Sequence, residues 1–270
     1  MKFTGNIRKM KSEAADVVQY ALPLYEILEP NHLVPLNDLI GKPIRLTYEN
    51  AIHCVVTGKK IKKAFGEGMS YEAFMNSPQA SPSIINPELS RIHEGIALRD
   101  YEWEMANHMQ PHYVYLSLTS GLKVGVTRTT QVPTRWIDQG ATQAIVLSET
   151  PYRQAAGLIE VALKAHLNDK TNWQQMLKGD AAETEMGVFK EQFSKFIPDE
   201  LKQYSLAENI EAKLKYPVLH YPEKVSSLKF DNLPEIEGVL TGIKGQYLML
   251  DNKKVLNIRS HAGYRISLEY

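Results

Sequence analysis

Cysteine is almost absent from this sequence, because Cys54 is the single example among 270 residues. One thiol excludes an intrachain disulfide, and such sparse cysteine usage is typical of proteins in a reducing compartment. Structural zinc needs about four nitrogen or sulfur ligands, so cysteine alone does not provide a zinc site in this chain.

Long apolar runs are also missing. No stretch approaches the roughly 18 consecutive apolar residues that indicate a membrane-spanning helix. The N-terminal residues MKFTGNIRKMK do not follow the pattern of a secretory signal peptide. These two absences predict a cytoplasmic protein without a membrane partner.

An excess of charge of either sign is absent as well. Lys and Arg total 31, as do Asp and Glu, so the formal net charge is zero. Strong non-specific binding of nucleic acid usually relies on a broad basic field, and this balance argues against it. A local basic cleft remains compatible with the composition.

Changes in composition divide the chain into five segments. We expect a β-rich segment at 1–50, an irregular module at 51–110, a core of strands and helices at 111–180, a helical segment at 181–216 and a second β-rich segment at 217–270. The predicted fold class is α+β. The two β-rich ends have similar short strands punctuated by glycine, and they would form either one shared sheet or a small barrel around the core.

The core segment has the clearest pattern of elements. Alternating apolar residues predict strands at 113–119, 122–127 and 143–148. A helix is expected between Pro133 and Gly140, followed after the third strand by a helix at 152–167. Further on, Ser205 and Glu208 have capping-box spacing and predict a short helix that ends at Leu214.

Five residues of this core are suited to a site for a phosphate ester. Gly125 would let a ligand approach the strand closely. Arg135 can stabilise phosphate charge, Glu160 can hold Mg²⁺, and Tyr115 or Lys123 can orient or deprotonate a water molecule. If they act together, the side chains of Tyr115, Lys123, Arg135 and Glu160 should line one concave surface.

The strings VYL, KVGVT and IEVALKAH, with Arg135 between the last two, resemble the core of the GIY-YIG nuclease superfamily. The resemblance implies a ββαβα module, with Tyr115, Gly125, Arg135 and Glu160 at the positions of the superfamily's site residues. It also implies cleavage of DNA or RNA with Mg²⁺ or Mn²⁺ bound at Glu160. The chain departs from the pattern at Lys123, which occupies the position of the second tyrosine.

A second resemblance covers nearly the whole chain. The strings QPHYVYLSLTSGLKVGVTR, QVPTRWIDQGATQAIVL, DKTNW and GIKGQYLMLDNKKVLNIRSHAGY resemble a bacterial family, the domain-of-unknown-function family 2797. This resemblance implies the domain layout but does not imply any particular activity.

The string HCVVTGKK at 53–60 has the form of a zinc knuckle that has lost its second cysteine. The second resemblance implies cysteines at the positions of Cys54, Thr57, Ser70 and Ala73, and often of Ser83 and Ser90. Since Cys54 is the only one present, we expect no zinc there.

Each candidate residue also has an ordinary structural interpretation. Tyr115 can be a half-buried strand aromatic, Gly125 can relieve a packing clash, and Glu160 can form an i,i+4 surface pair with Lys164. Arg135 can stack on Trp136. Two other functions therefore stay open beside a nuclease: a catalytically silent nucleic-acid-binding module, and a protein-interaction scaffold.

Overall fold

The computed structural model describes residues 1–167 and 172–270, which divide into two compact units. Unit 1 comprises Met1–Met75, Leu177–Gly179 and Lys215–Tyr270, and unit 2 comprises Asn76–Met176 and Asp180–Leu214. The two ends of the chain thus belong to unit 1, and the middle forms unit 2. Residues 169–171 of the DKTNW string lie outside the described residues.

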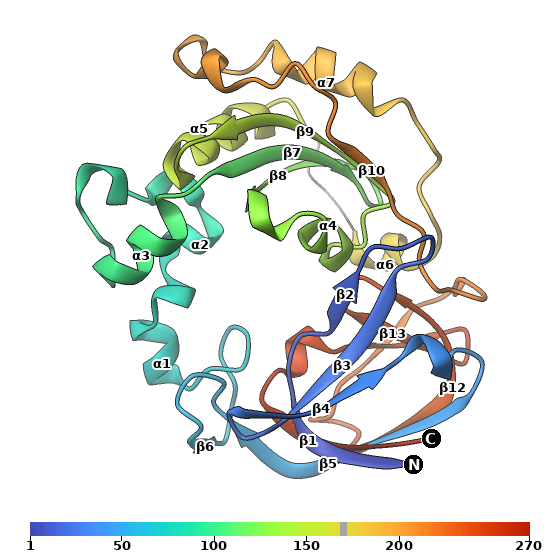
Figure 1. Cartoon of the computed structure of the whole chain (residues 1–270). Coiled ribbons are helices and arrows are strands. Elements are labelled where there is room, and N and C mark those ends of the chain that lie inside the picture. Colours follow the sequence, from blue (N-terminus) through green and yellow to red (C-terminus); the bar gives the residue numbers. More distant parts are fainter. Residues whose placement is uncertain (168–171) are drawn as a thin grey trace. The chain divides into compact units, whose positions relative to one another are not determined.

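Unit 1 is built on an 11-stranded sheet with the order β11-β14-β13-β12-β5-β15-β1-β3-β2, in which β4 also pairs with β3 and β6 with β5 (Figure 1). The strands are β1 (Lys2–Ile7), β2 (Lys11–Glu13), β3 (Gln19–Glu26), β4 (Glu29–Pro35), β5 (Pro43–His53), β6 (Lys60–Ile61), β11 (Ser226–Leu228), β12 (Glu235–Lys244), β13 (Tyr247–Leu250), β14 (Lys254–Asn257) and β15 (Tyr264–Glu269). Helix α1 (Tyr71–Asn76) ends at the boundary of the unit.

This sheet joins the two β-rich ends of the chain. Strand β1 pairs antiparallel with β15, so that Lys2 lies opposite Glu269, and β5 pairs with both β12 and β15. The pairing gives β1 and β5 a partner on each side and leaves neither as an exposed edge. One shared sheet, the first of the two predicted arrangements, is therefore confirmed. Among the described strands the order has two free ends, so the sheet is not a closed barrel.

Unit 2 contains an antiparallel four-stranded sheet with the order β10-β9-β7-β8. Its strands are β7 (His112–Leu118), β8 (Leu122–Arg128), β9 (Gln143–Thr150) and β10 (Glu211–Lys213), and its helices are α2 (Pro82–Ile85), α3 (Tyr101–His108), α4 (Thr134–Asp138), α5 (Arg153–Lys164), α6 (Trp173–Met176) and α7 (Met186–Ser194). The predicted order of two strands, helix, strand and helix is present as β7, β8, α4, β9 and α5. Strand β8 is an edge of the sheet.

The two faces of this sheet carry different helices. Buried Val114 and Leu116 of β7 share an apolar cluster with Ile159 and Leu163 of α5, a cluster that also includes Phe193 of α7. Figure 1 shows α5 and α7 on this side of the strands and α4 on the other. The strand alternation of side chains explains the division, because residues 114 and 116 point to one face and residue 115 to the opposite face.

Helix α4 ends where the sequence predicts. Gly140 has φ of +71°, a left-handed conformation that glycine adopts without a steric penalty. Its N–H donates to Ile137 O at 2.9 Å, and the N–H of Ala141 donates to Trp136 O at 3.1 Å. These two bonds form a Schellman motif, which satisfies the last carbonyls of the helix.

The helix predicted from Ser205 to Leu214 is wrong. This segment runs beside β9: the N–H of Leu206 donates to Leu147 O, and the N–H of Val146 donates to Ile210 O, each at 2.9 Å. Strand β10 then pairs with residues 143–145 of β9. Bonds to an otherwise unpaired strand edge outweigh the local capping signal, because that signal satisfies only a few backbone groups.

Within the described residues, none of the helices combines the length and the apolar character that a bilayer crossing requires.

Candidate functional site

A pocket of about 210 Å³ lies along the edge strand β8 in unit 2. Because no strand covers this edge, α4 on one face and α5 on the other both contribute to its walls, together with residues near the end of α2. Its charged lining residues are Lys123, Arg135, Arg153, Glu160 and Lys164. Four cationic side chains and one carboxylate thus share a small polar space, which favours an anionic ligand.

The structure brings together most of the residues that the sequence singled out. Lys123 and Gly125 of β8, Arg135 of α4 and Glu160 of α5 all line this pocket. Tyr115 is the exception, since its side chain is fully buried and is not part of the lining. The expectation that Tyr115 opens onto the same concave surface is therefore not met.

Tyr115 and Gly125 form a packing pair across strands β7 and β8. They lie directly opposite each other, and a Cβ atom on Gly125 would come within 2.6 Å of the Tyr115 hydroxyl. The tyrosine ring fills the space that the missing side chain leaves, which is the packing role that the sequence also allowed for Gly125. The Tyr115 hydroxyl donates to Gln139 Oε1 at 3.1 Å. Burial raises the pKa of Tyr115, against smaller opposing effects of Arg135 and Gln139, so the phenol stays protonated.

Glu160 combines an ordinary ion pair with an unsatisfied oxygen. Its Oε1 lies 3.3 Å from Lys164 Nζ, which is the i,i+4 pair that the sequence also allowed. Its Oε2 is buried and has no hydrogen-bond partner. Burial raises the pKa of Glu160, and Lys164 and Arg153 lower it less. A buried carboxylate oxygen without a partner is costly, and a cation bound in the pocket would remove that cost.

Arg153 is the main residue of this pocket that the sequence interpretation missed. Its Nε and Nη2 donate to the backbone oxygens of Ser83 at 2.8 Å and Ile84 at 2.9 Å. Burial lowers the pKa of Arg153 to about 10, partly offset by Glu160, so the guanidinium remains charged at neutral pH. The available signal was its spacing: Arg153 precedes Glu160 by seven residues, about two helical turns, and so lies on the same face of α5.

Gly157 allows the wall of the pocket to form. A Cβ atom at this position would lie 2.2 Å from the backbone nitrogen of Glu88. Helix α5 therefore packs directly on the 3₁₀ turn Pro87–Leu89, and Pro87 reaches the pocket. A larger residue would push this turn away from α5.

The pocket can be tested for its fit to Mg²⁺ or Mn²⁺. Among the described residues there is no cluster of three or more His, Cys, Asp or Glu side chains that would form a complete protein cage. Mg²⁺ usually keeps several waters and binds one or two carboxylates together with substrate phosphates. The unpartnered Oε2 of Glu160, in a pocket whose other charged groups are cationic, fits that mode of binding.

The segment around Cys54 in unit 1, which has the knuckle spacing, is held by hydrogen bonds. Cys54 is buried, and its sulfur accepts the N–H of Ser70 at 3.1 Å. Ser70 Oγ in turn accepts the N–H of Ala73 at 3.1 Å. Burial raises the pKa of the Cys54 thiol, but hydrogen bonds from Thr57 and from backbone N–H groups outweigh that effect and lower it to about 7. The first and third knuckle positions therefore still lie side by side.

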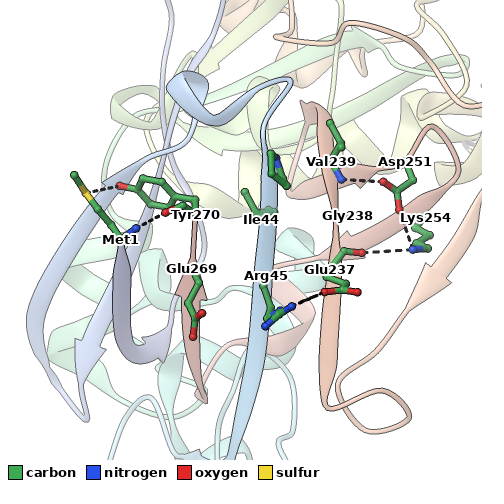
Figure 2. A pocket seen from close by; sticks show the side chains of 11 residues that line it. Met1, Ile44, Arg45, Glu237, Gly238, Val239, Asp251, Lys254, Glu269 and Tyr270 are labelled. Carbon is green, nitrogen blue, oxygen red and sulfur yellow. Dashed lines mark hydrogen bonds and ion pairs between the residues drawn. The ribbon is translucent and has the colours of Figure 1, made fainter.

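Unit 1 has a larger pocket of about 590 Å³ on the β5, β12 and β15 strands. Figure 2 shows two ion pairs among its charged groups: Arg45 Nη2 lies 3.0 Å from Glu237 Oε2, and Lys254 Nζ lies 2.8 Å from Asp251 Oδ2. Glu269, which also lines the pocket, pairs with Lys2 at 2.9 Å. Asp251 also accepts the N–H of Val239. Of the described lining residues, none has a buried side-chain polar atom without a partner. Size alone therefore does not make it the stronger candidate.

Comparisons with known proteins give one match. A family model described as "Protein of unknown function (DUF2797)" matches residues 41–266. No curated protein and no solved structure matches the chain.

Proposed function

We propose, for a chain that belongs to the DUF2797 family, that the pocket along β8 binds a phosphodiester group of DNA or RNA and cleaves it with the help of Mg²⁺ or Mn²⁺ at Glu160. The observation that carries this proposal is the buried, unpartnered Oε2 of Glu160 in a pocket lined by four cationic side chains. The resemblance to the GIY-YIG superfamily at Tyr115, Gly125, Arg135 and Glu160 supports the same assignment.

Each side chain has a proposed part in binding and orientation. Arg135 offers a planar guanidinium group to phosphate oxygens, and Lys123 adds a point charge from the strand edge. Arg153, whose Nε and Nη2 already bond the backbone, adds positive charge to the pocket. A divalent cation at Glu160 would supply Lewis-acid polarisation of the phosphoryl oxygens. Tyr115 acts here as a positioning residue, because its buried hydroxyl holds Gln139 and is not placed to take a proton from water.

A second candidate function has its own observation. Tyr115 is buried, and Lys123 replaces the second tyrosine of the resembling superfamily, so the pocket lacks a tyrosine that contacts water. A pocket of this kind can still bind a phosphodiester group through its cations. The alternative is therefore a nucleic-acid-binding module that does not cleave.

The test compares Glu160→Gln with the wild type on labelled DNA and RNA, with Mg²⁺ or Mn²⁺ and with a chelator. We expect cleavage by the wild type that stops with the chelator. In the variant the rate should fall by roughly a hundredfold or more, because the carboxylate that lines the pocket is lost. Glu191→Gln, an exposed change on α7, is the matched control and should cleave at the wild-type rate.

Binding measured in parallel separates the alternatives. Arg135→Ala should weaken binding and reduce the slope of affinity against salt by about one phosphate contact, whereas exposed Arg91→Ala should change neither. Salt-dependent binding with no cleavage by either wild type or Glu160→Gln would leave the silent binding module. If the wild type binds no nucleic acid at low salt, both nucleic-acid functions fail and the scaffold remains.

A further inference from the structure

Ile85 is an unusually exposed apolar residue at the rim of the β8 pocket. Its exposed fraction is 80%, and it is nevertheless one of the residues that line the pocket. Leaving an isoleucine in water forgoes the stabilisation of roughly 1.5–3 kcal/mol that full burial provides. Single exposed apolar residues are common, so exposure alone assigns no role. Its position beside a cationic pocket indicates a role only in combination with a second observation.

The backbone around Ile85 is fixed in place. Arg153 of α5 donates two hydrogen bonds to the carbonyl oxygens of Ser83 and Ile84, the two residues that precede it. Two residues after it, Pro87 begins the 3₁₀ turn that packs directly on Gly157. The rim is thus anchored to α5 on both sides of Ile85. An anchored rim presents the side chain outward instead of letting it fold back onto the core.

The size and charge of the pocket identify what can lie against Ile85. The volume of about 210 Å³ is below the roughly 300 Å³ at which pockets for whole small molecules begin. A phosphate group fits such a space, but a nucleoside attached to it must remain outside. The four cations at the pocket attract the phosphate, so the attached sugar and base are left at the rim where Ile85 stands.

We infer that Ile85 packs against the face of an unpaired nucleobase next to the phosphate held in the pocket, so that the substrate class is single-stranded or locally unpaired nucleic acid. Aliphatic side chains placed between or against bases are a known way of holding unstacked nucleotides. This inference rests on the proposed function, since it takes the ligand of the pocket to be a phosphodiester.

The test uses two probes with the same phosphates: a short oligothymidylate and an abasic oligomer of equal length, both titrated at low salt without divalent cations. The wild type should bind the oligothymidylate more tightly. Ile85→Ala should lower that affinity by roughly five- to tenfold, the loss expected for one apolar contact with a base, and should leave the affinity for the abasic oligomer unchanged. Ile85→Phe should keep the wild-type preference for the oligothymidylate over the abasic oligomer, because an aromatic ring stacks on any base.

Val188→Ala, a change at a residue of α7 with an exposed fraction of 62%, is the matched control and should alter neither affinity. If Ile85→Ala binds both probes as the wild type does, the inference is overturned while Arg135-dependent binding still supports the proposed function. If the wild type binds neither probe, the inference and the proposed function are both overturned. Self-association that Ile85→Ala abolishes would assign the residue to a second copy of the chain and would also overturn the inference.

Discussion

At the scale of single residues, the contact between Gly125 and Tyr115 shows how a residue that suggests a ligand site can serve packing. Glycine in a strand often marks a close approach by another group. Here the group is the cross-strand tyrosine ring, which also contacts Trp136 edge-on with 5.9 Å between the ring centroids. The β8 wall of the pocket therefore depends on a glycine that makes room for a tyrosine ring.

Substitution of this glycine should destabilise unit 2. In Gly125→Ala the new methyl group would meet the Tyr115 side chain at 2.6–2.7 Å, and we expect the free energy of unfolding to fall by about 1–3 kcal/mol, as is typical of overpacked cores. Gly121→Ala is the control, because a Cβ atom there meets nothing within 4 Å. Urea unfolding of both variants measures the difference, and equal stabilities would contradict the packing role.

The sequence predicted the pocket residues for which both the side-chain chemistry and the order along the chain indicated a shared site. Lys123, Arg135 and Glu160 do share one pocket. The burial of Tyr115 was not predictable, because strand alternation shows which residues share a face but not which helix covers that face. Arg153 was missed because its place depends on the backbone of Ser83 and Ile84, about 70 residues away in the sequence.

At the scale of elements, the end of α3 and the start of β7 bury two histidines. The side chains of His108 and His112 are almost completely inaccessible, and the Nε2 atom of each lacks a hydrogen-bond partner. His108 Nδ1 lies 3.2 Å from Ser90 Oγ, and His112 Nδ1 donates to Gln110 O at 2.7 Å. Burial, followed by the nearby charge of Arg153, lowers the pKa of His108 to about 3. Burial is also the main cause that lowers the pKa of His112, to about 4.

These pKa values predict a loss of stability in mild acid. Both histidines are neutral in both states well above pH 6.5, their ordinary pKa, so they contribute no pH dependence there. As the pH falls from about 6.5 to about 4, the unfolded chain takes up protons that the folded chain does not, and the free energy of unfolding falls, by on the order of 1–2 kcal/mol per histidine at about pH 5.

Urea unfolding at about pH 7.5 and pH 5 measures this loss. His108→Gln and His112→Gln should each reduce the difference between the two pH values, whereas the exposed change His220→Gln should not. A wild-type loss that both buried-site variants retain in full would show that other groups cause it.

The elements themselves were predictable where a local pattern and the final packing agree. The alternation in 113–127 and the helical spacing after 152 match β7, β8 and α5 within a few residues. The end of α4 followed from Gly140, because a left-handed residue after a helix is a local requirement. The segment at 205–214 was not predictable, since its strand conformation depends on pairing with β9 far away in the chain.

At the scale of the whole molecule, the shared sheet of unit 1 explains why the two ends of the chain have the same texture. Strands from both ends belong to one sheet, and the direct pairing of β1 with β15 joins them. The N-terminal amino group also donates to the carbonyl oxygen of Tyr270. The sequence was compatible with both a shared sheet and a barrel, because the composition of the strands does not define the order in which they pair.

The proposed phosphodiester and metal site along β8 is tested most directly by crystals soaked with Mn²⁺ and a short oligonucleotide, with anomalous diffraction used to place the metal. We predict one Mn²⁺ about 2.0–2.3 Å from Glu160 Oε2, with a phosphate group between it and Arg135. A phosphate bound in the pocket without Mn²⁺ at Glu160 would contradict cleavage at this site. A pocket that holds neither group would contradict the proposed function as a whole.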